Sequence, residues 1–292
     1  MYVYVYLDMR TIDFVISEKD NNKRIRDFLR DFGVSSSLLT KLKNTENGII
    51  LNGKFARTID IIHCGDILTV SIENSGRMPR PLINNQVKKI YSDEDILVLD
   101  KPAMMPVHES RNHQGDTLAN VAACYMDSDT AFRSVYRLDR DTSGLVLIAK
   151  NELAACKLAG KIKKDYYAVC GGILTGRGII ECPIKRTSDS IIKRCVSDDG
   201  EKAVTRWEAL KNDGENTLLK INLETGRTHQ IRVHFLHIGH PLLGDTLYGG
   251  KCDRIKRQAL HCKTIYFTHP VTEKPMMIDS AFPEDFLGCL KE

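Results

Sequence analysis

Two uninterrupted apolar runs constrain the fold of this chain more than any other feature. Residues 96–99 (Ile-Leu-Val-Leu) and 145–149 (Leu-Val-Leu-Ile-Ala) are bounded by polar or turn-forming residues. Runs of this length that lack an alternation of polar and apolar residues predict strands that are buried on both faces. A chain of 292 residues is long enough for one large domain around such strands and one small domain.

The segments around these runs favour a mixed sheet. Predicted strands outnumber predicted helices and do not alternate regularly with them, which argues against a doubly wound parallel sheet. The sequence therefore predicts an α+β domain over residues 87–292. Its further strands are expected at residues 166–170, 203–210 and 217–223.

A small α+β unit is predicted over residues 18–73. Ile25, Phe28, Leu29 and Phe32 follow the spacing of one helix face, and Gly33 is suited to end that helix. A second short helix is expected after the serines at 35–37, followed by a hairpin with a type I′ turn at Asn-Gly 52–53 and by a strand from residue 67. Residues 1–17 are expected to form an arm or an edge strand. Residues 74–86, rich in Pro, Asn and Gly, are predicted as a linker.

Positive charge is concentrated in this small unit. The net charge of the chain is +4. Residues 19–57 contain nine basic and four acidic residues, so the rest of the chain is close to neutral. A basic patch on a neutral body is typical of a nucleic-acid-binding module. The basic residues expected to contact RNA from the helices are Lys23, Arg24, Arg26, Arg30, Lys41 and Lys43.

Composition and motifs argue against several classes of protein. No run of about 18 apolar residues is present, which predicts that nothing spans a membrane. The first ten residues lack the pattern of a signal peptide. The nine cysteines are odd in number and form no Cys-x-x-Cys pair, so we expect reduced thiols and a cytoplasmic location. No Gly-x-Gly-x-x-Gly follows a strand, so hydride chemistry is not indicated.

The polar loop at residues 134–144 is the strongest candidate for chemistry. It precedes a buried strand, and loops held by a rigid scaffold commonly carry catalytic groups. Asp139 and Asp141 are flanked by Arg137 and Arg140. A surface salt-bridge loop is one interpretation. A glycosidase or nuclease with paired carboxylates is another, although a spacing of two residues does not set the separation that such enzymes need.

The same loop resembles the signature of RluA-type pseudouridine synthases, His-Arg-Leu-Asp-x-x-Thr-Ser-Gly, at every position except the first. Residues 164–169, 225–234 and 239–245 resemble further motifs of the family in the expected order, and the flanks at 100–102, 260–261 and 269–270 also fit. The resemblance covers about residues 85–288. It implies the pseudouridine synthase fold, with a mixed, mainly antiparallel sheet flanked by helices and loops. Residues 18–73 resemble the S4-like RNA-binding domain, as in RluC/RluD-like members.

By this resemblance Asp139 is the nucleophile that allows the uracil of a uridine in RNA to be cut from its ribose, rotated and rejoined through carbon. Attack at uracil carbon 6, attack at ribose carbon 1′ and abstraction of a ribose proton all stay open. Arg232 is expected to keep Asp139 ionised, because burial alone raises a carboxyl pKa. Tyr166 is expected to stack on the uracil. Tyr136 stands where the family has His, which does not put activity in doubt.

The resemblance also predicts substrate contacts. Arg137 is expected to take the space of the flipped base, and Ile231 to line the uracil pocket. Arg227 and Thr142 are expected to bind substrate as well. A helix predicted over residues 229–237, capped by Thr228, brings four histidines close together, and a zinc site is the sharper interpretation of them. No Cys or carboxylate has ligand spacing, and the resemblance implies that neither a metal nor a cofactor is used. The four are His229, His234, His237 and His240.

Ribosomal RNA of the large subunit is favoured over transfer RNA as substrate, because an S4-like module is typical of such members. We expect a monomer. The alternative is an RNA-binding ribosome assembly factor without catalysis. That alternative is disfavoured, because an inactive relative is expected to lose Asp139, Tyr166 or Arg232, and all three are present.

Overall fold

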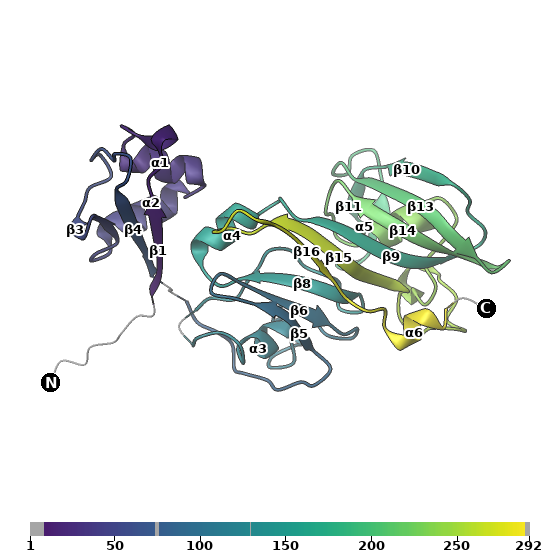
Figure 1. Ribbon diagram of the computed structural model, residues 1–292. Helices are drawn as coiled ribbons and strands as arrows, with labels where there is room; N and C mark the ends of the chain where they lie inside the picture. Colours follow the sequence, from purple (N-terminus) through teal and green to yellow (C-terminus); the bar gives the residue numbers. More distant parts are fainter. Residues whose placement is uncertain (1–8, 74–75, 129, 290–292) are drawn as a thin grey trace.

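The computed structural model describes residues 9–73, 76–128 and 130–289, which form two units around two sheets (Figure 1). The small unit, residues 9–73, has a four-stranded sheet in the order β1-β4-β2-β3. The strands are β1 (Met9–Val15), β2 (Ile49–Leu51), β3 (Lys54–Phe55) and β4 (Ile67–Glu73). β1 is an edge strand paired along its whole length with β4, so this sheet begins before the boundary predicted at residue 18. Residues 1–8 lie outside the described part.

Two helices and a short 3-10 turn complete the small unit. The helix α1 ends at Gly33, whose φ of 103° is easily reached only by glycine, as the sequence predicts. The hydroxyl of Ser35 accepts the Leu38 N–H and caps α2. Asn52 and Gly53 have φ values of 50° and 76°, which fits the expected type I′ hairpin. The elements are η1 (Glu18–Asp20), α1 (Ile25–Phe32) and α2 (Ser36–Asn44).

The large unit, residues 76–289, is built on a ten-stranded sheet whose main path runs β10-β13-β14-β9-β15-β8-β6-β5. All its pairings are antiparallel except β15 with β8, which confirms the mixed, mainly antiparallel sheet. Both apolar runs of the sequence form buried strands, β6 and β8, which are paired with each other. The strands are β5 (Lys88–Ser92), β6 (Ile96–Lys101), β7 (Arg133–Ser134), β8 (Ser143–Ala149), β9 (Lys163–Gly171), β10 (Arg177–Glu181), β13 (Val204–Asn212), β14 (Asn216–Leu223), β15 (Leu260–Thr268) and β16 (Pro275–Asp279).

Short helices and a separate hairpin flank this sheet (Figure 1). The hairpin of β11 (Ile184–Arg186) and β12 (Arg194–Val196) forms a two-stranded sheet of its own. No helix in the described ranges is long and apolar enough to cross a membrane. The helices are α3 (Leu118–Ala122), α4 (Glu152–Leu158), α5 (Gln230–His237), η2 (Thr246–Tyr248) and α6 (Glu284–Leu287).

The prediction that Thr228 caps the helix after the turn at residues 224–227 is wrong. The capping position is His229, which adopts a left-handed conformation with φ 57° and ψ 18°. The preceding turn is instead fixed by Gln230, whose side-chain oxygen accepts the Thr225 hydroxyl and the Arg227 N–H. The backbone therefore turns sharply at His229 before α5 begins.

The two units are packed against each other through α4, which lies at the end of the large unit that faces the small one (Figure 1). Leu153 is 1% exposed and belongs to the apolar core of the small unit. The Lys157 ammonium lies 3.4 Å from the centre of the Phe32 ring, and Lys41 pairs with Glu152. In the segment predicted as a linker, Met78 is buried in the core of the large unit. At least this part of the predicted linker is therefore packed on the large unit.

Candidate active site

Asp139 lies in the loop between β7 and β8, and a close approach of two strands fixes the end of that loop. The parallel pair β8–β15 places Gly144 beside Cys262. A Cβ atom on Gly144 would lie 2.2 Å from the Cys262 carbonyl oxygen, and its φ is 117°. Only glycine is compatible with this contact. The Thr142 N–H donates to the Asp139 carbonyl oxygen at 3.1 Å, which closes the turn beneath the carboxylate.

A buried lysine anchors the other side of the loop. Lys101 is fully buried, and its Nζ donates to the carbonyl oxygens of Pro102, Met105 and Arg140 at 2.8–2.9 Å. Three carbonyl acceptors match the three donors of an ammonium group. Burial lowers the pKa of Lys101 to about 7, while the charges of Asp141 and Asp139 act in the opposite direction. Because Arg140 follows Asp139, this ammonium holds the backbone next to the carboxylate.

Arg232 on α5 connects Asp139 to a second carboxylate. Its Nη1 donates to Asp139 Oδ2 at 3.1 Å. Its Nε and Nη2 donate to the two carboxylate oxygens of Asp245 at 2.7 and 2.8 Å. Asp245 is 1% exposed and Arg232 7%, whereas a quarter of the Asp139 side chain is accessible. The bidentate pair orients the guanidinium and leaves one N–H edge for Asp139.

Charge balance keeps this arginine charged despite its burial. Burial lowers the pKa of Arg232, but the hydrogen bond and charge of Asp245, followed by the charge of Asp139, raise it above its ordinary value. A fixed guanidinium offsets the cost of holding a carboxylate ionised in a partly dry site. The arrangement therefore suits a reaction that begins with Asp139 as an anion.

Tyr166 on β9 lies in the same row of the sheet as the end of the loop that carries Asp139. Tyr166 pairs with Cys262, and Cys262 pairs with Gly144, so the three residues follow one another across β9, β15 and β8. Tyr166 is 5% exposed. Burial and the nearby groups Cys262 and Asp139 raise its pKa well above the ordinary value, so the phenol stays protonated. The phenol is therefore a neutral group within electrostatic reach of Asp139.

The other residues predicted to bind substrate occupy different environments. Arg137 is exposed and makes no hydrogen bond or ion pair to any residue in the described ranges. Ile231 is 4% exposed and belongs to the core of the large unit. Thr142 is buried and its hydroxyl accepts the Gln258 amide, so it supports the loop from within. Arg227 bonds to the Lys202 carbonyl and pairs with Glu201, away from Asp139.

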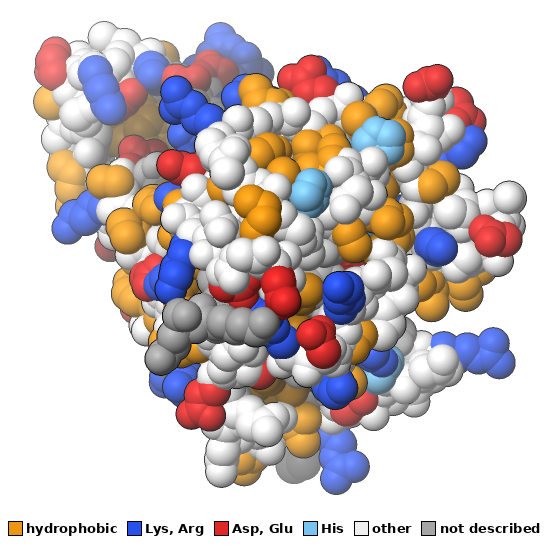
Figure 2. All heavy atoms as spheres, turned by 90° about the vertical axis from the view of Figure 1, so that its right-hand side faces the viewer, with side chains coloured by type: hydrophobic (Ala, Val, Ile, Leu, Met, Phe, Trp, Pro, Cys, Tyr) orange, Lys and Arg blue, Asp and Glu red, His pale blue; other side chains and the backbone are white. Residues whose placement is uncertain are grey.

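The six basic residues predicted to contact RNA lie on the small unit but are not equally available. Lys23 pairs with Asp20 and Asp31, and Lys41 pairs with Glu152 of the large unit. Arg26 is paired with its neighbour Asp27. Three side chains are exposed and make no ion pair with a described residue, namely Arg24, Arg30 and Lys43. On the face of the large unit shown in Figure 2, basic and acidic side chains are interspersed and form no continuous basic surface.

The four histidines of the helix region do not converge on one point. His234 contacts the Thr205 hydroxyl and the Cys182 carbonyl, and His240 contacts the Gly171 carbonyl. His229 contacts the Tyr248 hydroxyl. Three of the rings therefore have separate structural partners, and the fourth, His237, is exposed.

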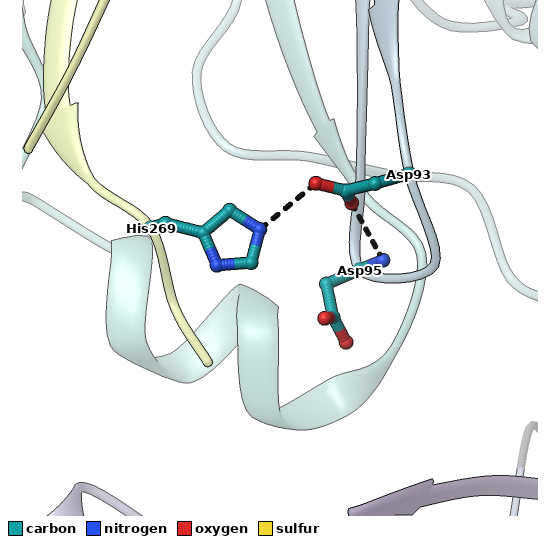
Figure 3. A group of neighbouring side chains, drawn as sticks. All are labelled: Asp93, Asp95 and His269. Carbon is teal, nitrogen blue, oxygen red and sulfur yellow. Dashed lines mark hydrogen bonds and ion pairs between the residues drawn. The ribbon is translucent and has the colours of Figure 1, made fainter. Parts of the chain in front are cut away.

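A different group, Asp93, Asp95 and His269, is compact enough to suggest a metal site (Figure 3). His269 Nδ1 accepts two backbone N–H groups, so Nε2 carries the proton and donates to Asp93 at 2.9 Å. Both oxygens of Asp95 are bound by Arg10. The ring nitrogens and the Asp95 oxygens are thus already used, and the group joins β1 to the large unit through Arg10.

Comparisons with known proteins agree with this geometry. The family described as RNA pseudouridylate synthase matches residues 95–237. An uncharacterised RNA pseudouridine synthase of Bacillus subtilis (strain 168) is 36% identical over 278 residues, which span 91% of this chain and 98% of the relative. The chain belongs to the RNA pseudouridine synthases. A ribosomal large subunit pseudouridine synthase D of Pseudomonas aeruginosa is 37% identical to this synthase over 265 residues, 83% of this chain and 82% of the relative.

Solved structures also resemble this synthase. The human RNA pseudouridylate synthase domain containing 1 superposes with a TM-score of 0.56 at 25% identity, over 70% of this chain and 86% of that chain. The human RNA pseudouridylate synthase domain containing 4 shares the fold, with a TM-score of 0.55 at 20% identity. The α+β fold with a pseudouridine synthase sheet is thereby confirmed.

Sequence reasoning assigned no role to two residues that hold the site of this synthase together. Asp245 ends the predicted motif at residues 239–245, but nothing in its spacing shows that it binds Arg232. Lys101 lies in the flank at residues 100–102, which fits the family but gives its side chain no role. In both cases the family motif marks the residue, but only the folded structure shows which group its side chain binds.

Replacing Asp245 with Asn should impair both stability and catalysis in this synthase. The amide offers one acceptor instead of two and leaves part of a buried guanidinium unpaired, which costs roughly 3 kcal/mol. We expect kcat to fall by about 100-fold, since Arg232 loses its orientation. Denaturant unfolding and single-turnover assays measure the two effects. Asp285→Asn breaks a similar bidentate pair with Arg257 at a more exposed position. A loss of kcat as large in that control would contradict a specific role for Asp245.

Replacing Tyr136 with His should leave the synthase active. The Tyr136 hydroxyl donates to the Leu145 carbonyl at 2.9 Å and its ring lies under Lys164, so it supports the start of β8 rather than Asp139. We expect a loss of about 1 kcal/mol in unfolding free energy. Turnover should stay within about threefold of the wild type, because the substitution changes no group that contacts Asp139. Complete loss of turnover in a folded variant would contradict this interpretation.

Proposed function

We propose that this synthase isomerises specific uridines in large-subunit ribosomal RNA with Asp139 as its nucleophile. The observation that carries the proposal is the chain Asp139–Arg232–Asp245, because it supplies a charged carboxylate with one fixed cation and leaves a quarter of that carboxylate accessible. In the competing hydrolase interpretation the second carboxylate is Asp141, but both of its oxygens are bound by Arg140.

The reaction requires the glycosidic carbon–nitrogen bond to break and a carbon–carbon bond to form while the base stays in the pocket. Attack by Asp139 on uracil carbon 6 or on ribose carbon 1′ holds the base or the sugar covalently, and abstraction of a ribose proton is the third route. Each route begins with an ionised Asp139. The neutral phenol of Tyr166 can stack on the uracil ring throughout. Metal and cofactor are not required by any of these steps.

Access to the base requires that the uridine leave its stack, which costs a few kcal/mol. The exposed guanidinium of Arg137 lies two residues before Asp139 and can occupy the vacated space. Ile231, at the start of α5, is suited to pack against the uracil through its apolar side. Arg227 and Thr142 are proposed to affect substrate binding indirectly. Arg227 acts through the turn before α5, and Thr142 acts through the loop of Asp139.

Ribosomal RNA is proposed as substrate on two grounds. The curated relative from Pseudomonas aeruginosa is named for the ribosomal large subunit. The small unit carries exposed basic side chains on α1, on its cap and on α2, as expected of an S4-like RNA-binding domain. Sequence-specific RNA recognition usually targets unpaired uridines in loops. The competing candidate is an assembly factor that binds the same RNA without changing it.

Asp139→Asn should abolish pseudouridine formation while leaving RNA binding nearly unchanged. The amide is uncharged and is not a nucleophile, so we expect a loss of at least about 10⁴-fold in single-turnover rate. Carbodiimide mapping of RNA from cells with the wild-type gene, the variant or neither identifies the target and tests activity together. Normal modification by the variant would sink the proposed function. Unmodified RNA in all three strains would favour the assembly factor.

Removing the exposed charges Arg24, Arg30 and Lys43 by substitution with Gln should make RNA binding less dependent on salt. Each lost phosphate contact flattens the slope of log K against log salt by about 0.7 for single-stranded RNA, so the triple variant should differ by about 2. Binding titrations at several salt concentrations measure the slope. The control removes three exposed charges from the large unit, Arg177, Lys211 and Lys251. An equal change in both variants would contradict RNA binding centred on the small unit.

A further inference from the structure

His229 lies between the catalytic carboxylate and a buried tyrosine. Its Nε2 is 3.9 Å from Asp139 Oδ2, and its Nδ1 is 2.9 Å from the Tyr248 hydroxyl. The side chain is 10% exposed. The left-handed backbone at His229 directs the ring to this place, because the helix begins only at the next residue.

The hydrogen bonds around Tyr248 determine which ring nitrogen of His229 carries the proton. The backbone N–H of Arg194 donates to the Tyr248 hydroxyl oxygen at 2.9 Å. Burial raises the pKa of Tyr248, so its phenol keeps its hydrogen. Among the described residues, His229 Nδ1 is the other hydrogen-bonding partner of this hydroxyl. The phenol therefore donates to Nδ1, and the hydrogen of the neutral ring lies on Nε2.

We propose that His229 is a positioning residue for Asp139, held by Tyr248 in the tautomer that directs an N–H toward the nucleophile. The inference rests on the proposed role of Asp139. The 3.9 Å distance exceeds hydrogen-bond range, and such contacts commonly tighten only when substrate is bound. Arg232 and His229 then bind the same oxygen of Asp139, one as a cation and one as a neutral donor. The other oxygen is left to react.

Tyr248 supports both of these donors. Its ring lies under the Arg232 guanidinium, with the central carbon 5.0 Å from the ring centroid. Its hydroxyl connects His229 to Arg194 at the start of β12. The separate hairpin β11–β12 is therefore linked to the nucleophile by a backbone N–H, a phenol and an imidazole.

The ring of His229 is neutral near neutral pH, which suits a donor rather than a second cation. Burial lowers its pKa, and the charge of Asp139 offsets this only in part. The charged groups that act on His229 are Asp139, Arg232, Asp245 and Arg194. The titratable groups within electrostatic reach of Asp139 are Lys101, Tyr166, His229, Arg232 and Tyr248.

The test compares His229→Asn with His229→Gln in the full chain. Asparagine tolerates the left-handed backbone and reaches the Tyr248 hydroxyl, but it has no donor at the Nε2 position. Glutamine can place an amide N–H there. We expect His229→Asn to lower kcat about tenfold with KM for RNA within about twofold. The acid limb of its kcat profile should move to higher pH, because a carboxylate that loses a donor has a higher pKa. Glutamine should restore most of kcat and the position of the limb.

Tyr248→Phe and His237→Asn complete the experiment. The phenylalanine variant frees His229 to adopt the other tautomer, so kcat and the acid limb should shift in the same direction by a smaller amount. His237 is exposed at the far end of α5, and its variant should match the wild type. If His229→Asn does not fold, Tyr248→Phe decides alone.

Two results would overturn the inference. One is a wild-type kcat and acid limb in both His229→Asn and Tyr248→Phe. The other is a fall in kcat without a shift of the limb, or one that glutamine does not restore, since either marks a structural role. In both cases an inactive Asp139→Asn variant shows that the proposed function still stands. An active Asp139→Asn variant would instead remove the proposed function itself.

Discussion

A single guanidinium shared between two carboxylates determines how this synthase is organised. Arg232 is almost completely buried, and a buried charge is costly unless it is paired and hydrogen-bonded. Asp245 satisfies two of its donor groups and fixes the plane of the group, which leaves a third directed at Asp139. The interaction is valuable for orientation more than for stability, because the desolvation of such pairs offsets much of their attraction. The loop of Asp139 is arranged to meet this fixed cation.

The loop of Asp139 is held beside the Arg232 guanidinium by contacts from separate parts of the sheet. Lys101 on β6 binds the loop backbone at Arg140, and the contact of Gly144 with β15 fixes the loop where β8 begins. Both contacts act on the backbone, and the Lys101 ammonium is directed at carbonyl oxygens rather than at the Asp139 carboxylate. Preorganisation of this kind avoids reorientation during the reaction, which is where much of the catalytic advantage of fixed groups arises.

The sequence was sufficient for the local elements. Periodicity and turn chemistry predicted α1, the β2–β3 hairpin and the two buried strands β6 and β8, because these depend on neighbours along the chain. It did not predict that β15 lies between β8 and β9, since those pairings join segments more than ninety residues apart, and only the pairing with β8 is parallel. It also missed the left-handed His229, because contacts of the Gln230 side chain with Thr225 and Arg227, rather than a capping side chain at residue 228, shape that turn. Within the site it found Asp139 and Arg232 but not their supports, which are contacts across strands.

The strand β8 connects the loop of Asp139 with the small unit that is proposed to bind RNA. Its first residue follows the loop of Asp139, and its last leads to α4, whose Leu153 is buried in the core of the small unit. Seven extended residues span on the order of 23 Å, and this strand is buried along its whole length, so it is rigid. The ion pairs of Lys41 with Glu152 and of Arg10 with Asp95 hold the small unit at the same end. If the small unit grips RNA as proposed, β8 then acts as a spacer. The uridine that reaches Asp139 is the one at that fixed distance from the gripped segment, so selection of the target depends on RNA shape as well as on the pocket.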